Sequence, residues 1–273
     1  MSGGFLEEMA GASQARVASA RRLRTEAELQ RLVAALGPAP RLHRDDSGFD
    51  LIAELKLRSP AAGALRGTDE DIPQRVRAYA RGGAAAVSVL TEPSRFDGQL
   101  EHLGSAAAAL LPTRVPAVRK DFLVDPYQVL EARLAGAGGI LVILRMLSRA
   151  QIDALLGCAR EQGMFVLLEA FDAADIQQMH AVVGSHGAGM DLLAGINCRD
   201  LRTLQVVPQR LLELLPLLPQ EVPRVAESGV ASEEDARSIA AAGYDMALIG
   251  SALMRGGDPQ ALVAALLCAG RSA

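Results

Sequence analysis

The stretch FVLLEAFDAADIQQMHAVVGSHGAGMDLLAGIN, residues 165–197, decides the fold class. It begins and ends with short apolar runs of strand type, Phe165–Glu169 and Leu192–Asn197, and the segment between them has apolar residues at helical spacing. Two buried strands joined by a helix form a βαβ unit, in which both strands lie parallel in one sheet. The stretch therefore predicts an α/β fold with a parallel sheet.

The same alternation of strand-like runs and amphipathic segments repeats along the chain. Eight such units in roughly 220 residues fit a closed (β/α)8 barrel, the TIM barrel, better than an open doubly wound sheet. An open sheet would usually carry a G-x-G-x-x-G turn, and none follows any run. We therefore predict a single barrel domain over residues 50–270. The other six runs are Leu51–Lys56, Ala84–Leu90, Val115–Lys120, Gly139–Leu144, Val222–Glu227 and Met246–Gly250.

The segments between the runs carry helix start and stop signals. N-caps are expected at Ser148, Asp172 and Ser232, and helix ends at Gly82, Gly136, Gly163, Gly184 and Gly243. Residues 5–36 also have helical spacing and stop at Gly37-Pro38, which predicts an N-terminal helical extension within residues 1–45. The expected helices include Ile72–Arg81, Pro126–Ala135, Ser148–Gln162, Ala173–Val183, Pro208–Leu215, Ser232–Ala242 and Pro259–Cys268.

The composition excludes several classes of protein. Half of the 273 residues are hydrophobic, which is enough to fill a core and rules out intrinsic disorder. A net charge of −4 without a dense basic stripe argues against a nucleic-acid partner. No apolar run approaches the ~20 residues that span a membrane, and charged residues interrupt the N-terminal segment where a signal peptide would need an apolar core. We expect a cytoplasmic protein, a monomer or small homo-oligomer, without a membrane partner.

Lysine is rare in this chain, because only Lys56 and Lys120 among its 28 basic residues are not arginine. Lys56 ends the first strand-like run and Lys120 ends the third. In (β/α)8 barrels the active site lies at the carboxyl ends of the strands. A lysine, unlike an arginine, can give up its proton. Both lysines are therefore candidates for a catalytic role.

Glu54 precedes Lys56 by two residues in the first run and so shares its face, and Glu169, Asn197 and Glu227 end other runs at the same rim. Carboxyl, ammonium and amide groups together are typical of acid–base catalysis. The four histidines and three cysteines show no metal-ligand spacing. Ser251 has no nearby histidine, so the residues do not predict a Ser-His-Asp triad. We expect no metal and no cofactor.

Two Gly-Ser arrangements, Ser228-Gly229 and Gly250-Ser251, follow the last two runs. Barrels of this class commonly bind phosphate there through backbone N–H groups. The alternative is that Gly250-Ser251 is only a tight turn and a helix cap. We predict a phosphorylated small-molecule substrate, and we expect a valine at Gly250 to fill the anion's place while leaving the lysines assembled.

Six blocks of sequence resemble the indole-3-glycerol phosphate synthase family. They are Ile52–Lys56 with Ser59-Pro60, Ser88–Glu92 with Phe96 and Gly98, Arg119–Phe122 with Asp125–Gln128 and Glu131–Arg133, Gly195–Asn197 with Arg199–Leu201, Ala226–Gly229, and Gly250–Met254. The resemblance implies a (β/α)8 barrel that acts in tryptophan biosynthesis without a cofactor. It would convert 1-(2-carboxyphenylamino)-1-deoxyribulose 5-phosphate to indole-3-glycerol phosphate, CO2 and water.

The resemblance also implies roles for residues of this chain. Lys120 would be the general acid for ring closure, with Glu169 as partner acid or base, and Lys56 and Glu54 would fix substrate and transfer protons. Two ammonium groups beside a phosphorylated ligand are also expected to lower the pKa of a lysine. The remaining implied residues are Asn197 and Glu227, which would orient substrate and lysines, and Ser59, Arg199, Ser228, Gly229, Gly250 and Ser251, around the phosphate or carboxylate.

The chain departs from the family's usual pattern at three places. Ala170-Phe171 follow Glu169 where valine and histidine are usual, Cys198 stands where asparagine or alanine is common, and Ala61-Ala62-Gly63 follow Ser59-Pro60. None of these changes removes a catalytic group. They leave open a paralogue that acts on a substituted substrate in a specialised pathway.

Other interpretations of the same residues remain open. Glu54 and Glu227 are also explained as structural partners of the lysines, Arg199 as one half of an exposed salt bridge, and Cys198 as a packing residue. Phe96 and Phe122 are expected to be apolar walls. Another phosphosugar barrel enzyme, such as phosphoribosylanthranilate isomerase, would share the phosphate site but lack the two lysines with Glu169 and Asn197. A barrel retained only as a binding protein would have lost the rim groups.

Overall fold

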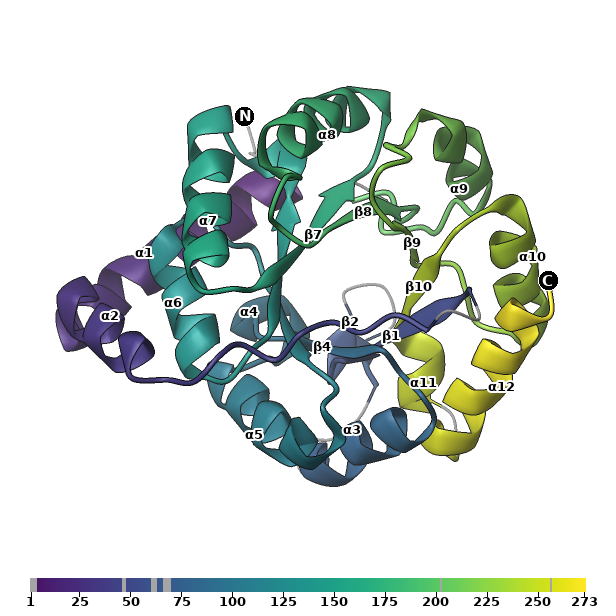
Figure 1. The fold of residues 1–273 in the computed structure, drawn as a ribbon, viewed down its shortest axis with the longest axis horizontal. Helices are drawn as coiled ribbons and strands as arrows, with labels where there is room; N and C mark the ends of the chain where they lie inside the picture. Colours follow the sequence, from purple (N-terminus) through teal and green to yellow (C-terminus); the bar gives the residue numbers. More distant parts are fainter. Residues whose placement is uncertain (1–3, 46–47, 60–62, 66–69, 202, 256) are drawn as a thin grey trace.

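The computed structural model describes residues 4–45, 48–59, 63–65, 70–201, 203–255 and 257–273. Its centre is a closed barrel of parallel strands in the order β1-β10-β9-β8-β7-β6-β5-β4, which confirms the predicted (β/α)8 fold class (Figure 1). A short antiparallel pair, β2 (Arg58–Ser59) and β3 (Gly63–Ala64), lies outside the barrel. The barrel strands are β1 (Asp50–Leu55), β4 (Ala86–Leu90), β5 (Ala117–Lys120), β6 (Gly139–Ile143), β7 (Phe165–Ala170), β8 (Leu192–Asn197), β9 (Arg224–Glu227) and β10 (Met246–Ile249).

Helices surround the barrel (Figure 1). Ser148, Asp172 and Ser232 cap helices as predicted, each accepting hydrogen bonds from backbone N–H groups of the first turn. The predicted stop at Gly184 is wrong, because α8 continues to His186 and Gly187 follows it. The helices are α3 (Ile72–Arg81), α4 (Pro93–Phe96), α5 (Leu100–Leu110), α6 (Pro126–Leu134), α7 (Arg149–Glu161), α8 (Ala173–His186), α9 (Gln209–Leu214), α10 (Glu233–Ala242), α11 (Ser251–Arg255) and α12 (Pro259–Arg271), with single 3-10 turns at Leu111–Thr113, Leu144–Met146 and Leu215–Leu217.

The N-terminal extension consists of two helices, α1 (Phe5–Leu23) and α2 (Glu26–Ala34). The chain breaks between them because Thr25 caps α2: the Thr25 N–H donates to the Glu28 carboxylate at 2.9 Å, and the Thr25 hydroxyl accepts from the Glu28 N–H. Both helices lie beside α6 and α7 (Figure 1). Among the described residues, no helix is both long and apolar enough to cross a bilayer.

Side chains alternate along each barrel strand between the interior and the surrounding helices. One apolar cluster fills the interior, and a second lies between the strands and the helices. The interior cluster takes residues from every barrel strand: Ile52, Ala86, Val118, Leu141, Ile143, Phe165, Leu167, Leu193, Val225, Met246 and Leu248.

The polar residues at the strand ends continue this interior alternation. Glu54 lies two residues beyond Ile52, Glu169 two beyond Leu167, and Glu227 two beyond Val225. Residues two apart on a strand point to the same face. The carboxyl groups therefore form the last layer of the barrel interior, above the apolar layers.

The contact between Gly139 and Phe165 tests how tightly this interior is packed. The two residues are partners in β6 and β7, and a Cβ atom on Gly139 would meet the Phe165 ring at 2.5 to 2.7 Å. We expect Gly139→Ala to destabilise the protein by about 1–3 kcal/mol through overpacking. Urea denaturation with a fixed m-value measures this change.

Gly157 in α7 is the matched control, because a Cβ atom there would have no atom within 4 Å. Gly157→Ala should stabilise the protein by up to about 1 kcal/mol, through helix propensity. Equal effects of the two alanines would show that the barrel interior is not close-packed at Gly139.

Candidate active site

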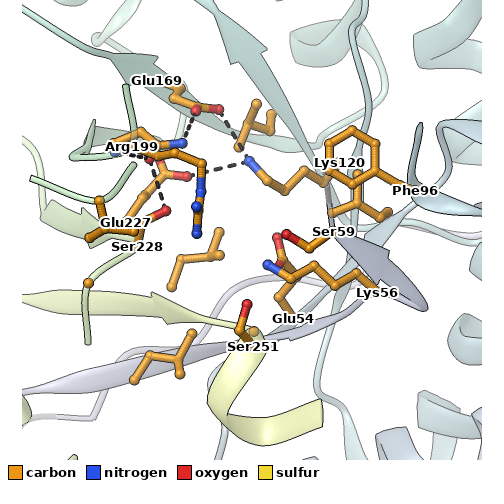
Figure 2. A pocket seen from close by; sticks show the side chains of 18 of the residues that line it. Glu54, Lys56, Ser59, Phe96, Lys120, Glu169, Arg199, Glu227, Ser228 and Ser251 are labelled. Carbon is orange, nitrogen blue, oxygen red and sulfur yellow. Dashed lines mark hydrogen bonds and ion pairs between the residues drawn. The ribbon is translucent and has the colours of Figure 1, made fainter. Parts of the chain in front are cut away.

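A cavity of about 440 Å³ lies at the carboxyl ends of the barrel strands. Figure 2 shows side chains that line it and labels ten of them, which point toward one another from β1, β5, β7 and β9 and the loops beyond the strands. The structure brings together in this cavity all twelve residues that the sequence singled out. They are Glu54, Lys56, Ser59, Lys120, Glu169, Asn197, Arg199, Glu227, Ser228, Gly229, Gly250 and Ser251.

Lys120 lies between two carboxyl groups (Figure 2). Its Nζ donates to Glu169 Oε2 at 3.2 Å and lies 3.6 Å from Glu227 Oε2. Glu169 is 2% exposed and Glu227 is 1% exposed, whereas the Lys120 side chain keeps 16% of its surface open to the cavity. The lysine is thus a charged group held by buried carboxyls and presented to a ligand.

The charges around Lys120 set its protonation state. Burial by itself lowers its pKa, but the carboxyl groups of Glu169, Glu227 and Glu54 outweigh burial and raise the pKa above the ordinary value for lysine. The expectation of a lowered lysine pKa is therefore wrong for Lys120, because the site holds three carboxyls close to two ammonium groups. At neutral pH Lys120 carries a proton.

Asn197 connects Glu169 to the end of β9. Its Nδ2 donates to Glu169 Oε1 at 2.6 Å, and its Oδ1 accepts from the Ser228 hydroxyl at 2.9 Å and from the Arg199 N–H at 2.9 Å. These bonds fix the amide's orientation and leave Glu169 one oxygen for Lys120. The Ser228 hydroxyl, expected as a donor to phosphate, donates to Asn197 instead.

A second ion pair joins Lys56 and Glu54 at the carboxyl end of β1 (Figure 2). Burial raises the pKa of Glu54, but Lys56 and Lys120 outweigh it and lower the pKa below its usual range. A Cβ atom at Gly250 would collide with the Glu54 carboxylate and come within 3.0 Å of Lys56 Nζ. The expectation that a side chain at Gly250 leaves the lysines assembled is therefore wrong, and Gly250 makes room for this ion pair.

Glu227 is the third buried carboxyl. Its oxygens have no hydrogen-bond partner among the described residues, and Lys120 is too distant to donate to it. Burial and the nearby Glu169 raise the pKa of Glu227 well above its ordinary value, although Lys120 opposes them. Glu227 therefore holds its proton to a higher pH than an ordinary glutamate does.

The chain turns sharply after β9. Ser228 and Gly229 both have left-handed backbone conformations, with φ of 68° and 77°. A left-handed serine is uncommon, and such strain clusters at functional sites. The turn places both residues at the cavity, on the side where Ser251 begins α11 after the neighbouring strand β10.

Arg199 and Cys198 follow β8. The Arg199 guanidinium lines the cavity and donates to the Leu204 carbonyl at 2.8 Å. Cys198 is buried, and burial raises the pKa of its thiol to about 11, so the thiol is protonated at neutral pH. Packing, and not nucleophilic chemistry, accounts for this cysteine.

Phenylalanine rings form an apolar wall of the cavity. Phe96 and Phe122 were expected there, and Phe5 of α1 and Phe171 after β7 join them. Phe5 packs edge-on against Phe122, with ring centroids 5.8 Å apart. Four of the six phenylalanines thus line one cavity. The sequence analysis does not predict Phe5 as a cavity residue, because its helix precedes the barrel. The one available signal is that Phe5 lies four residues before buried Met9 and so shares a helix face with it.

Other pocket residues were also missed from the sequence, among them Asp121 and, at the end of α11, Arg255. Within the described part of the chain, histidine, cysteine and carboxyl side chains form no group of three that would hold a metal ion. Pro60, Ala61 and Ala62 of the sequence comparison lie outside the described residues.

Comparison with known proteins agrees with this geometry. The family model for indole-3-glycerol phosphate synthase matches residues 6–266. The chain is 44% identical to indole-3-glycerol phosphate synthase of Micrococcus luteus, with 86% of both chains covered. It is 40% identical to indole-3-glycerol phosphate synthase 2 of Streptomyces coelicolor, covering 97% of this chain and 99% of the relative.

Two solved structures share the fold at low identity. Thiamine phosphate pyrophosphorylase from Pyrococcus furiosus aligns with a TM-score of 0.57 at 14% identity, covering 82% of this chain and 96% of that one. 3-Hexulose-6-phosphate synthase from Salmonella typhimurium aligns with a TM-score of 0.60 at 15% identity, covering 81% and 97%. These two similarities concern the barrel fold alone.

The raised pKa of Glu227 predicts how stability depends on pH. The folded state keeps this proton at pH values where the unfolded carboxyl, with a pKa of about 4.3, has lost it. Ionisation of Glu227 therefore removes stability as pH rises above that value. Glu227→Gln cannot ionise, so its stability relative to the wild type should increase between pH 5 and pH 8.

Thermal unfolding of both proteins at the two pH values measures this difference. A stability difference that is constant or decreases with pH would show that Glu227 is ionised in the folded protein.

Proposed function

The chain belongs to the indole-3-glycerol phosphate synthase family, and on that premise we propose how its own residues carry out the reaction. It converts 1-(2-carboxyphenylamino)-1-deoxyribulose 5-phosphate to indole-3-glycerol phosphate, CO2 and water, as a carboxy-lyase of tryptophan biosynthesis. The observation that carries the assignment of roles is the pair of lysines, each held by a buried carboxyl in one cavity.

Ring closure requires an acid. The aryl carbon that bears the carboxylate attacks the ketone carbon, and the ketone oxygen gains negative charge. Lys120 is the proton donor to this oxygen, because it is protonated at neutral pH and opens to the cavity. The product of the step is a ring that carries a hydroxyl group, an iminium nitrogen and the carboxylate.

Decarboxylation and dehydration follow. The bond to the carboxylate breaks and CO2 leaves, and its electron pair restores the aromatic ring and neutralises the nitrogen. The hydroxyl then departs as water with a proton from an acid, while a base removes a proton from the neighbouring CH2 carbon. We assign the base to Glu169 and the acid to Lys56, which pairs with Glu54. Glu169 then returns its proton to Lys120, to which it is hydrogen-bonded, and Lys56 regains a proton from solvent, so one proton is consumed over the cycle.

The cavity has two chemically different sides that orient the substrate. Ser228, Gly229 and Ser251 line the side formed after β9 and β10. Phe122 and Phe171 line the opposite side, after β5 and β7. Phosphate therefore binds on the β9–β10 side, where Arg255 adds a cation, and the aryl ring packs against the phenylalanine wall.

The remaining assignments are also proposals. The chain acts as one domain, because the α1 residues Phe5 and Met9 pack in the same cluster as the barrel interior. We place it in the cytoplasm, as a monomer or a small homo-oligomer that binds neither nucleic acid nor membrane.

Lys120→Arg and Lys120→Ala should both abolish turnover while the fold stays intact, because arginine does not transfer its proton. Product formation is followed by indole fluorescence, which is clean because the chain contains no tryptophan. Circular dichroism controls for folding. No indole product from the wild type would contradict the proposed function, and Lys120→Arg activity within tenfold of the wild type would contradict the role of Lys120.

Glu169→Gln should lower kcat and leave KM nearly unchanged. Glutamine keeps the shape and a hydrogen-bonding oxygen but cannot accept a proton from carbon, so the loss belongs to the chemical step. Steady-state kinetics separates the two constants. A rise in KM alone would make Glu169 a binding residue and move the base to Glu54.

Inorganic phosphate should compete with substrate, and Gly250→Ala should lower kcat as well as raise KM. The new Cβ would push on the Glu54–Lys56 ion pair beside the phosphate side. Gly257→Ala is the control, because a Cβ atom there would meet nothing within 4 Å. Non-competitive inhibition, or a Gly250→Ala enzyme with unchanged kcat, would place the phosphate elsewhere.

A further inference from the structure

Asp121 follows Lys120 directly and is a centre of hydrogen bonding beneath the cavity. Its side chain is 1% exposed. The carboxylate accepts hydrogen bonds from Thr91 Oγ1 at 2.7 Å, from the Phe122 N–H at 2.8 Å and from Arg119 Nη2 at 3.3 Å. A fourth donor comes from outside the barrel, since Arg16 of α1 donates its Nη2 at 2.6 Å. Asp121 thus joins the loop after β5 to β4 and to α1.

Arg16 contacts a second buried carboxylate as well. Its Nη1 lies 3.6 Å from Glu92 Oε1, and the Glu92 side chain is fully buried. Glu92 caps α4 by accepting from the backbone N–H groups of Ser94 and Arg95. Because α4 ends at Phe96, this carboxylate fixes the helix that carries one ring of the apolar wall.

Glu92 lies in the segment after β4, which carries Phe96. Asp121 lies in the segment after β5, directly between Lys120 and Phe122. Arg16 therefore bridges the loops after β4 and β5, and the same helix places Phe5 against Phe122. Arg119 pairs with Asp121 at 3.3 Å from within the barrel, and Arg16 contacts both Asp121 and Glu92. Arg16 is a cation between them, although its own side chain is 29% exposed.

We propose that Arg16 is a positioning residue for the reaction: it fixes the loops after β4 and β5 and thereby sets the place of Lys120 relative to the apolar wall. The proposal rests on the role proposed for Lys120. This role goes beyond attaching the N-terminal extension to the barrel, since other ion pairs of α1 also attach it. Glu8 pairs with Arg95 at 2.6 Å and Arg21 with Asp125 at 2.8 Å, and these four side chains are 25 to 53% exposed, whereas the carboxylates that Arg16 contacts are at most 1% exposed.

The test compares Arg16→Ala with two attachment controls, Arg21→Ala and Glu8→Ala, well below their melting midpoints. A displacement of about 1 Å at a catalytic group can lower a rate by roughly 100-fold. We expect Arg16→Ala to lower kcat about 10- to 100-fold with KM within about threefold. Arg16→Lys should recover part of this loss, because an ammonium group still reaches one carboxylate. Each control should stay within about twofold of the wild type.

A second measurement uses the two lysines and needs no substrate. Lysine labelled with 13C at Cε gives NMR signals for Lys56 and Lys120 alone. Arg16→Ala should shift the Lys120 signal and leave the Lys56 signal in place. Because this protein is ligand-free, the measurement tests the positioning even if the wild type makes no indole product.

Two results would overturn the proposal. One is an Arg16→Ala enzyme with kcat within twofold of the wild type and an unmoved Lys120 signal. The other is an equal loss in Arg21→Ala and Glu8→Ala, which would reduce Arg16 to one of several attachments. Should Arg16→Ala not fold, Arg16→Gln takes its place with the same expected loss and the same two contradictions.

Discussion

An ammonium group buried in a barrel is stable only if carboxyl groups surround it, and the site is built around this constraint at Lys120. Glu169 accepts a hydrogen bond from Lys120 Nζ. The carboxyl group of Glu227 lies 3.6 Å from the same nitrogen. Removing one partner from such a set would leave an uncompensated buried charge, which proteins tolerate poorly. The same arrangement suits the role proposed for Lys120, because it keeps a proton on the lysine at neutral pH, where the proposed acid must act.

The charge balance links this lysine to the rest of the cavity. Lys56 pairs with Glu54 and Lys120 with Glu169, while burial and the nearby Glu169 raise the pKa of Glu227 well above its ordinary value. Asn197 fixes Glu169 by donating to the oxygen that Lys120 does not use. A change at one of these residues therefore alters the protonation of the others, since groups that interact this strongly titrate as a set.

The sequence predicted the fold, and it predicted that the polar residues at the strand ends meet at one rim, because both follow from strand periodicity; Ser59 and Arg199 came from the family resemblance, and they line the same cavity. Parallel strands place every second residue inside the barrel, so a polar residue two beyond an interior apolar one, as Glu169 is beyond Leu167, must reach the catalytic end. Features that depend on three-dimensional contact were not predictable. The direction of the Lys120 pKa shift needs distances to three carboxyls, and the role of Gly250 needs the position of Glu54. The break before Thr25 was visible as a Thr-x-x-Glu capping pattern within the helical spacing.

Carboxyl groups that keep Lys120 protonated are the basis of the acid role proposed for it. Titration of the 13Cε lysine signals by NMR, in the ligand-free wild type, measures this protonation directly, because Lys56 and Lys120 are the only lysines. We expect the Lys120 signal to titrate above the ordinary lysine pKa of about 10.4. A Lys120 midpoint below about pH 8 would contradict it, since the lysine would then have lost the charge that the carboxyl groups are held to maintain.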